Sequence, residues 1–120
     1  MDPSLSPLDT TTAQRLLRPV AWADRLVGWQ LHRRLGALPI DLQSLPDVLA
    51  LLTVTHPRLD LPGLARWCDT VLGDAPLARA IADAAAADTP PVEQHRQTAR
   101  IIEARLLQAI DKLDDAELRA

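Results

Sequence analysis

Residues 91–118 read PVEQHRQTARIIEARLLQAIDKLDDAEL, and this stretch carries the clearest structural signal in the sequence. Apolar or small residues recur in it at alternating spacings of three and four, and His95 fills the one remaining position of the series. A heptad pattern sustained over about four heptads predicts one long helix from about Pro91 to Leu118. The series consists of Val92, Ala99, Ile102, Leu106, Ala109, Leu113, Ala116 and Ala120.

The apolar face of this helix is wider than a two-stranded coiled coil needs, because Ile101, Leu107 and Ile110 lie outside the heptad series. A broad face is typical of a helix packed in a bundle, or of one that serves both its own core and a partner. Both interpretations remain open from the sequence.

A recurring start signal lies upstream of this helix, in which a capping residue is followed two positions later by proline. Proline is tolerated in the first helical turn, where backbone N–H groups have no intrahelical partner. The signals predict three short helices, at about 45–54, 61–72 and 75–87, before the long one. The four start signals are Ser44-Leu45-Pro46, Asp60-Leu61-Pro62, Asp74-Ala75-Pro76 and Asp88-Thr89-Pro90.

The sequence predicts an extended arm over residues 1–12, followed by a helical bundle domain over residues 13–120. Asp9 or one of the three threonines at 10–12 would cap the first helix. That helix is expected to run from Ala13 to Gly36, where glycine would end it. Pro19 interrupts the pattern, so the helix would either kink there or begin its main part there.

The amino-acid composition also predicts a helical protein. The chain of 120 residues is long enough for one core, and it holds 22 Leu and 19 Ala but no Phe or Tyr. Leu and Ala favour helices, and the aromatic and β-branched residues that favour strands are scarce. We therefore expect an all-α fold of about five helices, with long first and last helices bracketing three short ones.

The charge and the termini mainly exclude classes of protein. A net charge of −3 disfavours nucleic-acid binding over the whole surface. The start of the chain lacks the pattern of a signal peptide, and no apolar run approaches the roughly 20 residues of a transmembrane helix. Together with a single cysteine, Cys68, these features predict a cytoplasmic protein.

Residues suited to catalysis or metal binding are few and scattered. The soft metal ligands are His32, His56, His95 and Cys68, and no two of them lie within six residues of each other. Cys68 lies on the apolar stripe of its expected helix, which favours a core position. The serines, glycines and carboxylates form no nucleophile, phosphate-binding or acid–base motif. We expect no catalytic residues, no metal, no cofactor and no small-molecule ligand.

A partner-binding site is the strongest functional signal. Residues 1–40 sum to +2, and Trp22, Leu26 and Trp29 lie at i, i+4 and i+7 with Arg33 four residues on. Trp and Arg are enriched at the centres of protein interfaces. Core packing and a membrane-surface helix are the alternatives for this face. The candidate contact residues are Trp22, Leu26, Trp29, Arg33, Ile102, Leu106, Ile110 and Leu113.

The function expected from these features is a non-enzymatic protein–protein interaction module, such as an adaptor, an accessory subunit or a chaperone-like binder. Its partner would be another protein or a second copy of itself.

One alternative is a small helix-turn-helix regulator built on residues 61–87, although its second helix offers only Arg79 to DNA, opposed by Asp83. A second alternative is a small helical enzyme or metal protein that uses the histidines or Cys68.

Overall fold

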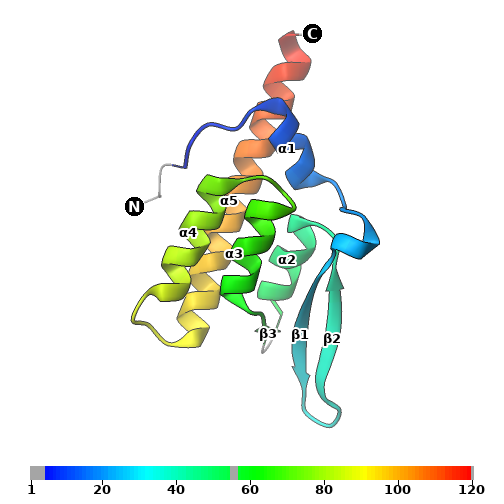
Figure 1. Cartoon of the computed structure of the whole chain (residues 1–120), viewed down its shortest axis with the longest axis vertical. Coiled ribbons are helices and arrows are strands. Elements are labelled where there is room, and N and C mark those ends of the chain that lie inside the picture. Colours follow the sequence, from blue (N-terminus) through cyan, green and yellow to red (C-terminus); the bar gives the residue numbers. More distant parts are fainter. Residues whose placement is uncertain (1–4, 55–56, 120) are drawn as a thin grey trace.

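The computed structural model describes residues 5–54 and 57–119, and it shows an α+β fold (Figure 1). Five α-helices and a three-stranded antiparallel sheet lie within these residues. The prediction of an all-α fold was therefore wrong. The helices are α1 (Thr10–Leu17), α2 (Leu45–Leu52), α3 (Leu61–Thr70), α4 (Ala75–Ala86) and α5 (Pro91–Arg119). The strands are β1 (Leu26–His32), β2 (Gly36–Leu42) and β3 (Pro57–Arg58).

The error lies in the expected first helix over residues 13–36. Helix α1 begins at Thr10, where the Asp9 side chain accepts a hydrogen bond from the Thr12 backbone N–H, and it ends at Leu17. Arg18 already has an extended backbone, since a residue before proline is disfavoured in the helical region. Pro19 thus ends the helix rather than bending it. A short 3₁₀ turn, η1 (Trp22–Asp24), then leads into the sheet.

A β-hairpin occupies the rest of the expected helix. Strands β1 and β2 pair from Leu26 with Leu42 to His32 with Gly36, which leaves a three-residue connection. Gly36 has a φ of +78°, the left-handed conformation that such hairpins place after a three-residue loop. This glycine therefore ends a hairpin turn, not a helix. Strand β2 is an edge strand and contains Pro39, which edge positions tolerate.

One face of the hairpin packs onto the helical body. Leu26, Gly28 and Gln30 alternate along this inner face, and Gly28 is fully enclosed. A Cβ atom on Gly28 would collide with the Leu51 side chain of α2 and would lie 3.3 Å from Leu42 Cδ1. Glycine is thus required for the close approach of β1 to α2.

The four helices downstream agree with the sequence prediction in place and order. Helices α2, α3 and α4 begin at the proline signals, and the long helix spans 91–119. The Ser44 hydroxyl and the Asp74 carboxylate cap α2 and α4 by accepting from the backbone N–H groups of Asp47 and Leu77. These signals succeed because they depend only on local chemistry.

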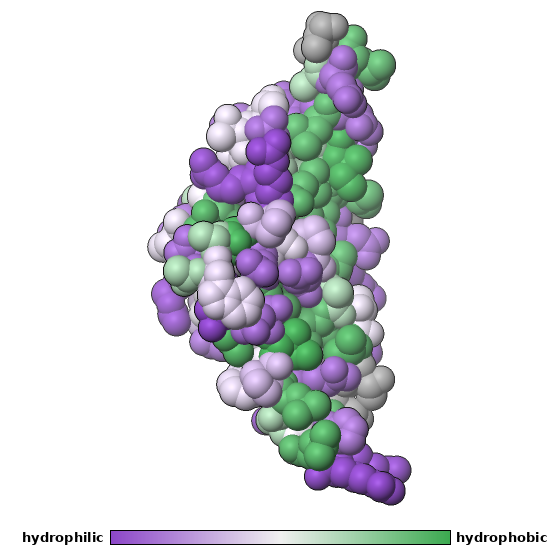
Figure 2. Space-filling view, turned by 90° about the vertical axis from the view of Figure 1, so that its right-hand side faces the viewer, coloured by the Kyte–Doolittle hydropathy of each residue, from purple (hydrophilic) through white to green (hydrophobic). Residues whose placement is uncertain are grey.

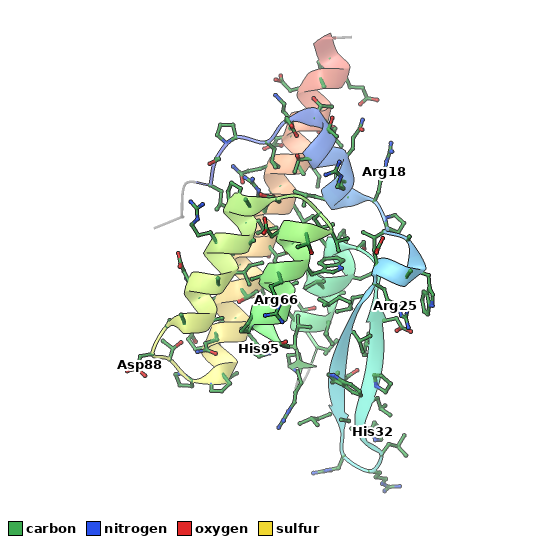
Figure 3. All side chains as sticks on the ribbon, in the orientation of Figure 1. Arg18, Arg25, His32, Arg66, Asp88 and His95 are labelled. Atoms are coloured by element: carbon green, nitrogen blue, oxygen red, sulfur yellow. The ribbon has the colours of Figure 1, made fainter. Side chains whose placement is uncertain are left out.

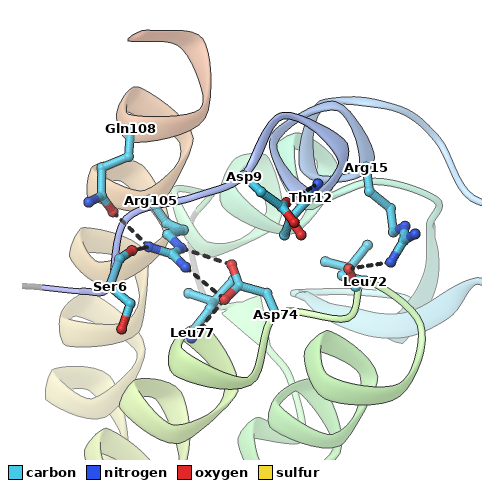
Figure 4. Close-up of polar contacts among 9 residues, drawn as sticks. All are labelled: Ser6, Asp9, Thr12, Arg15, Leu72, Asp74, Leu77, Arg105 and Gln108. Atoms are coloured by element: carbon cyan, nitrogen blue, oxygen red, sulfur yellow. Dashed lines mark hydrogen bonds and ion pairs between the residues drawn. The ribbon is translucent and has the colours of Figure 1, made fainter. Parts of the chain in front are cut away.

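A buried ion pair joins α5 to the start of α4 (Figure 4). The Arg105 guanidinium donates to both carboxylate oxygens of Asp74, with Nε to Oδ2 at 2.8 Å and Nη2 to Oδ1 at 2.9 Å. Both side chains are almost fully buried. Nη1 of Arg105 also donates to the Ser6 carbonyl and to Gln108 Oε1. One arginine thus fixes the N-terminal segment, the α3–α4 corner and α5 relative to one another.

Within the described part of the chain, none of the helices combines the length and the apolar character needed to cross a membrane.

Candidate interaction surface

The four candidate residues from the N-terminal third do not share a helical face. Trp22 lies in η1, Leu26 and Trp29 lie on β1, and Arg33 lies in the hairpin turn. Because side chains alternate along a strand, Leu26 and Trp29 point to opposite faces of the sheet. Leu26 is half-buried against the core, whereas Trp22, Trp29 and Arg33 are exposed. The predicted helical arrangement of these residues is corrected, but most of them lie on the surface.

Trp29 belongs to an apolar surface on the outer side of the sheet. Val27, Trp29 and Leu31 alternate along β1 on this side and are 39%, 43% and 37% exposed. We call these three residues the hairpin face. Their register partners on β2 are Asp41, Pro39 and Ala37, which are exposed too. No described segment covers this face, so three adjacent large apolar side chains meet solvent.

The edge of the hairpin face next to η1 is held by cation–π and ionic contacts. The Arg25 guanidinium stacks over the Trp22 ring, 4.0 Å from its centroid, and its Nε donates to Asp41 Oδ1 at 3.0 Å. Arg25 Nη1 also donates to the Trp22 carbonyl oxygen at 3.0 Å. Trp22 is 55% exposed, and one face of its ring lies against the Arg25 guanidinium.

The four candidate residues on α5 divide between the core and the surface. Ile102 and Leu106 are buried within the core and offer nothing to a partner while the domain is folded. Leu113 is partly buried against the core, and Ile110 is 43% exposed. Most residues of the heptad series thus pack in the core. Of the four candidates, the exposed one is Ile110, which lies outside the series.

An open groove lies between the sheet and the N-terminal half of α5 and has a volume of about 760 Å³. Its lining is mostly apolar and includes Leu31 of the hairpin face. Arg58, His95 and Arg96 add polar groups to it, and His95 lies in the first turns of α5 (Figure 3). The other lining residues are Leu52, Thr53, Val54, Pro57, Leu59, Pro91, Val92 and Ala99.

The polar groups of the groove differ in how they are engaged. His95 Nδ1 lies 2.8 Å from the Pro91 carbonyl and its Nε2 accepts from the Leu59 backbone N–H at 3.3 Å, so both ring nitrogens are engaged within the chain. Arg96 donates to Glu93 at 2.8 Å. For Arg58, no acidic partner lies within ion-pair distance among residues 5–54 and 57–119.

The C-terminal end of α5 is a second amphipathic surface, and it projects beyond the other helices at the top of Figure 1. Leu107, Ile110 and Leu118 are exposed there, Leu118 by 86%. The same end is acidic, because Asp111, Asp114, Asp115 and Glu117 outnumber Lys112 and Arg119.

Figure 2 shows how hydrophobic surface is distributed on the side of the molecule that carries the hairpin. Hydrophobic atoms form an almost continuous column along this side, from the projecting end of α5 at the top to the hairpin at the bottom. Hydrophilic atoms cover the tip of the hairpin below the column. Exposed apolar surface that is continuous over such a length is typical of interaction sites.

The groups considered for catalysis and metal binding do not come together. No cluster of three or more His, Cys, Asp or Glu side chains is found in the described residues. His32 is the last residue of β1, where its Nδ1 accepts from the backbone N–H groups of Arg34 and Leu35 in the hairpin turn, and His56 lies outside the described residues. Cys68 is buried; this burial, and to a smaller extent the charge of Asp74, raises the pKa of its thiol from 9.0 to about 12. A buried thiol with a raised pKa is unreactive.

The expected helix-turn-helix segment is present as two helices, α3 and α4, joined through Gly73. Their corner is occupied by the buried Asp74–Arg105 pair. On the exposed side of α4 the charged residues are Arg79 and Asp83. This surface therefore offers one cation and one opposing carboxylate to a DNA backbone.

Comparison of the chain with protein-family models, with curated proteins and with solved structures finds no match.

The hairpin face and the groove also contain residues that sequence reasoning did not select, namely Val27, Leu31, Arg58, Val92 and Arg96. The alternation of Val27, Trp29 and Leu31 was the available signal for the first two. The other three are brought to the groove by long-range packing, which no local pattern encodes.

Proposed function

We propose that the protein is a non-enzymatic protein–protein interaction module, acting as a dimer or in a hetero-complex. The observation that carries the proposal is the hairpin face, where Val27, Trp29 and Leu31 stand exposed side by side on a twisted strand. Apolar and aromatic side chains on a rigid element bury large areas at little entropic cost when a partner covers them.

The placement of Trp29 suits an energetic centre of such an interface. It lies in the middle of β1, between Val27 and Leu31 on the same face, with Pro39 opposite on β2 and Arg58 opposite on β3. Aromatic residues surrounded by apolar neighbours and a polar rim commonly dominate binding energy. The rim here is supplied by Asp41 and Arg58.

The proposed location is the cytoplasm, and it rests on the sequence alone, chiefly on the single cysteine, which suits a reducing compartment. We do not propose DNA binding, because no observation on α4 favours it. The proposal assigns no catalytic, metal-binding or cofactor-binding residue.

Affinity capture with the tagged full chain tests the proposal. The bait is compared with its Trp29→Ser variant and with Arg66→Ser, a control in which an exposed side chain on α3 is removed outside the hairpin face and the groove. We expect at least one protein to be recovered with the first and third baits and lost with Trp29→Ser. That protein is then purified, and its binding to all three chains is measured by calorimetry.

Truncating a central interface aromatic typically costs 2 kcal/mol or more, so we expect an affinity loss of about thirtyfold or greater for Trp29→Ser. The proposal is refuted if no captured protein depends on Trp29, or if the purified components bind Trp29→Ser as well as they bind the unaltered chain.

A further inference from the structure

The groove between the sheet and α5 has the chemistry of a receptor for an acidic amphipathic helix. Its lining is apolar along β3, the end of α2 and the start of α5, and its cationic groups are Arg58 and Arg96. Grooves of this kind take helices that present apolar anchors on one face, and charge selects among such helices. Arg58, which has no acidic partner within the described residues, is available for a carboxylate from outside.

The chain carries a helix of that description at its other end. On α5, Leu107, Ile110 and Leu118 follow at i, i+3 and i+11, so they lie along one side of the helix, and all three are exposed. Asp114 occupies the i+7 position of the same side, with Asp111 and Glu117 on its flanks. The projecting end is therefore apolar and acidic where the groove is apolar and basic.

The end of α5 cannot reach the groove of its own chain. Ala99, near the start of α5, lines the groove, and Leu118 lies on the same uninterrupted helix. At 1.5 Å per residue the two positions are about 28 Å apart along a rigid rod. Only a second molecule can bring this end into the groove.

We propose that two copies of the chain form an antiparallel dimer in which the acidic end of α5 of each copy docks in the groove of the other. The two-fold arrangement follows from the placement of the two surfaces. They lie at opposite ends of the elongated domain, and hydrophobic residues form an almost continuous column along one side of it (Figure 2). When one copy is rotated by 180° relative to the other, the acidic end of α5 of each copy meets the groove of the other. Both contacts then form within one dimer, so the assembly is closed and does not grow into a fibre.

This inference rests on the proposed function, because it names a second copy of the chain as one partner of the module. The contact it assigns is that of the end of α5 with the groove. The groove adjoins the hairpin face and shares Leu31 with it and Arg58 with its rim, but Trp29 does not line the groove, and Leu118 lies at the far end of α5. The two ideas can therefore fail separately.

Sedimentation velocity and light scattering of the full chain test the proposal over a range of concentrations up to about 100 μM, at which a dimer with a micromolar dissociation constant is populated. We expect a concentration-dependent monomer–dimer equilibrium. Leu118→Ser removes an anchor from both contacts of the dimer, and Arg58→Glu reverses the groove cation. Each should raise the dissociation constant by about tenfold or more, since each change acts twice in a two-fold dimer.

A charge-swap experiment tests the pairing itself. Arg58→Glu with Arg96→Glu should dissociate the dimer, as should Asp111→Lys with Asp114→Lys. All four substitutions in one chain should restore dimerisation, because both contacts then have complementary charges again. Arg66→Glu, an exposed charge reversal on α3 outside the groove, is the control and should leave the dissociation constant unchanged.

The proposal is overturned if the chain is monomeric throughout the concentration range. It is also overturned if a dimer forms that is indifferent to Leu118→Ser and Arg58→Glu, or if Trp29→Ser dissociates the dimer and Leu118→Ser does not. Circular dichroism of each variant confirms that it is folded before its association is measured. A monomeric unaltered chain that still binds a Trp29-dependent partner would refute this inference and leave the proposed function standing.

Discussion

Replacing Asp74 by Asn should destabilise the domain far more than any exposed substitution. The carboxylate of Asp74 accepts two hydrogen bonds from the buried Arg105 guanidinium, and its Oδ1 also caps α4. Asparagine can keep the cap, but it removes the charge and turns an amide N–H₂ toward an arginine N–H. Arg105 is only 1% exposed and would be left as a buried charge without its counter-ion.

The expected cost is about 3–5 kcal/mol, the usual effect of removing one partner from a buried ion pair. Small domains are stable by about 5–15 kcal/mol, so the variant should remain folded but lose a large part of its stability. Asp74→Ala removes the cap as well and should cost about 1 kcal/mol more. The double variant Asp74→Asn with Arg105→Met should recover part of the loss, because it no longer buries an unpaired charge.

Urea unfolding followed by tryptophan fluorescence measures these differences. Trp67 is buried and donates through Nε1 to the Asp24 carbonyl at 2.7 Å, so its emission reports on the folded core. Glu93→Gln breaks the exposed pair with Arg96 and serves as the control, with an expected cost below about 1 kcal/mol. The reasoning is refuted if Asp74→Asn falls within about 1 kcal/mol of the unaltered chain, or if the double variant is no more stable than Asp74→Asn.

Three further predictions concern the interior. Gly28→Ala should cost about 1–3 kcal/mol in urea unfolding, because the added methyl group collides with Leu51; a loss below about 0.5 kcal/mol would contradict this packing. The Cys68 thiol has a raised pKa in the folded state, so the unfolded state releases its proton first, and stability should fall as the pH rises above about 9. A Cys68→Ala variant should lack that component of the pH dependence, and equal slopes would refute it. His95→Ala removes the acceptor for the Leu59 N–H, and amide exchange at Leu59 should become about tenfold faster or more, whereas unchanged exchange would show that this hydrogen bond is not formed in solution.

The helices that the sequence predicted correctly are those whose signals are local. A capping residue with proline two positions later marks the starts of α2, α3 and α4, and the heptad series marks α5. Each depends on residues within one or two turns, so tertiary contacts had little opportunity to override it.

The hairpin was missed because its apolar residues fit both the periodicity of a helix and the alternation of a strand. Trp22, Leu26 and Trp29 fit a helical stripe, whereas Val27, Trp29 and Leu31 fit a strand, and the Leu-rich composition favoured the first interpretation. Gly36 was ambiguous in the same way, since glycine ends helices and also completes hairpin turns. The decisive evidence is the fit of Gly28 against α2, a contact between residues 23 positions apart that no local window contains.

The residues chosen from the sequence coincide only in part with the candidate interaction surface. The tryptophans of a protein without Phe or Tyr singled out Trp22 and Trp29, which are exposed in the structure but lie in a 3₁₀ turn and a strand instead of on one helix. The groove was not foreseen, because it is assembled from residues between Leu31 and Ala99 that only the fold brings together.

Pro39 has a consequence for how the sheet can be recognised. Strand β2 forms the outer edge of the sheet, and an unpaired edge invites a further strand from another molecule. Proline has no N–H to donate, and in edge strands that missing group faces solvent, which interrupts the row of donors at its centre. This interruption disfavours growth of the sheet at that edge into a cross-β fibre. In the proposed function, a partner would therefore contact the outer side of the sheet through side chains rather than extend the sheet by a strand.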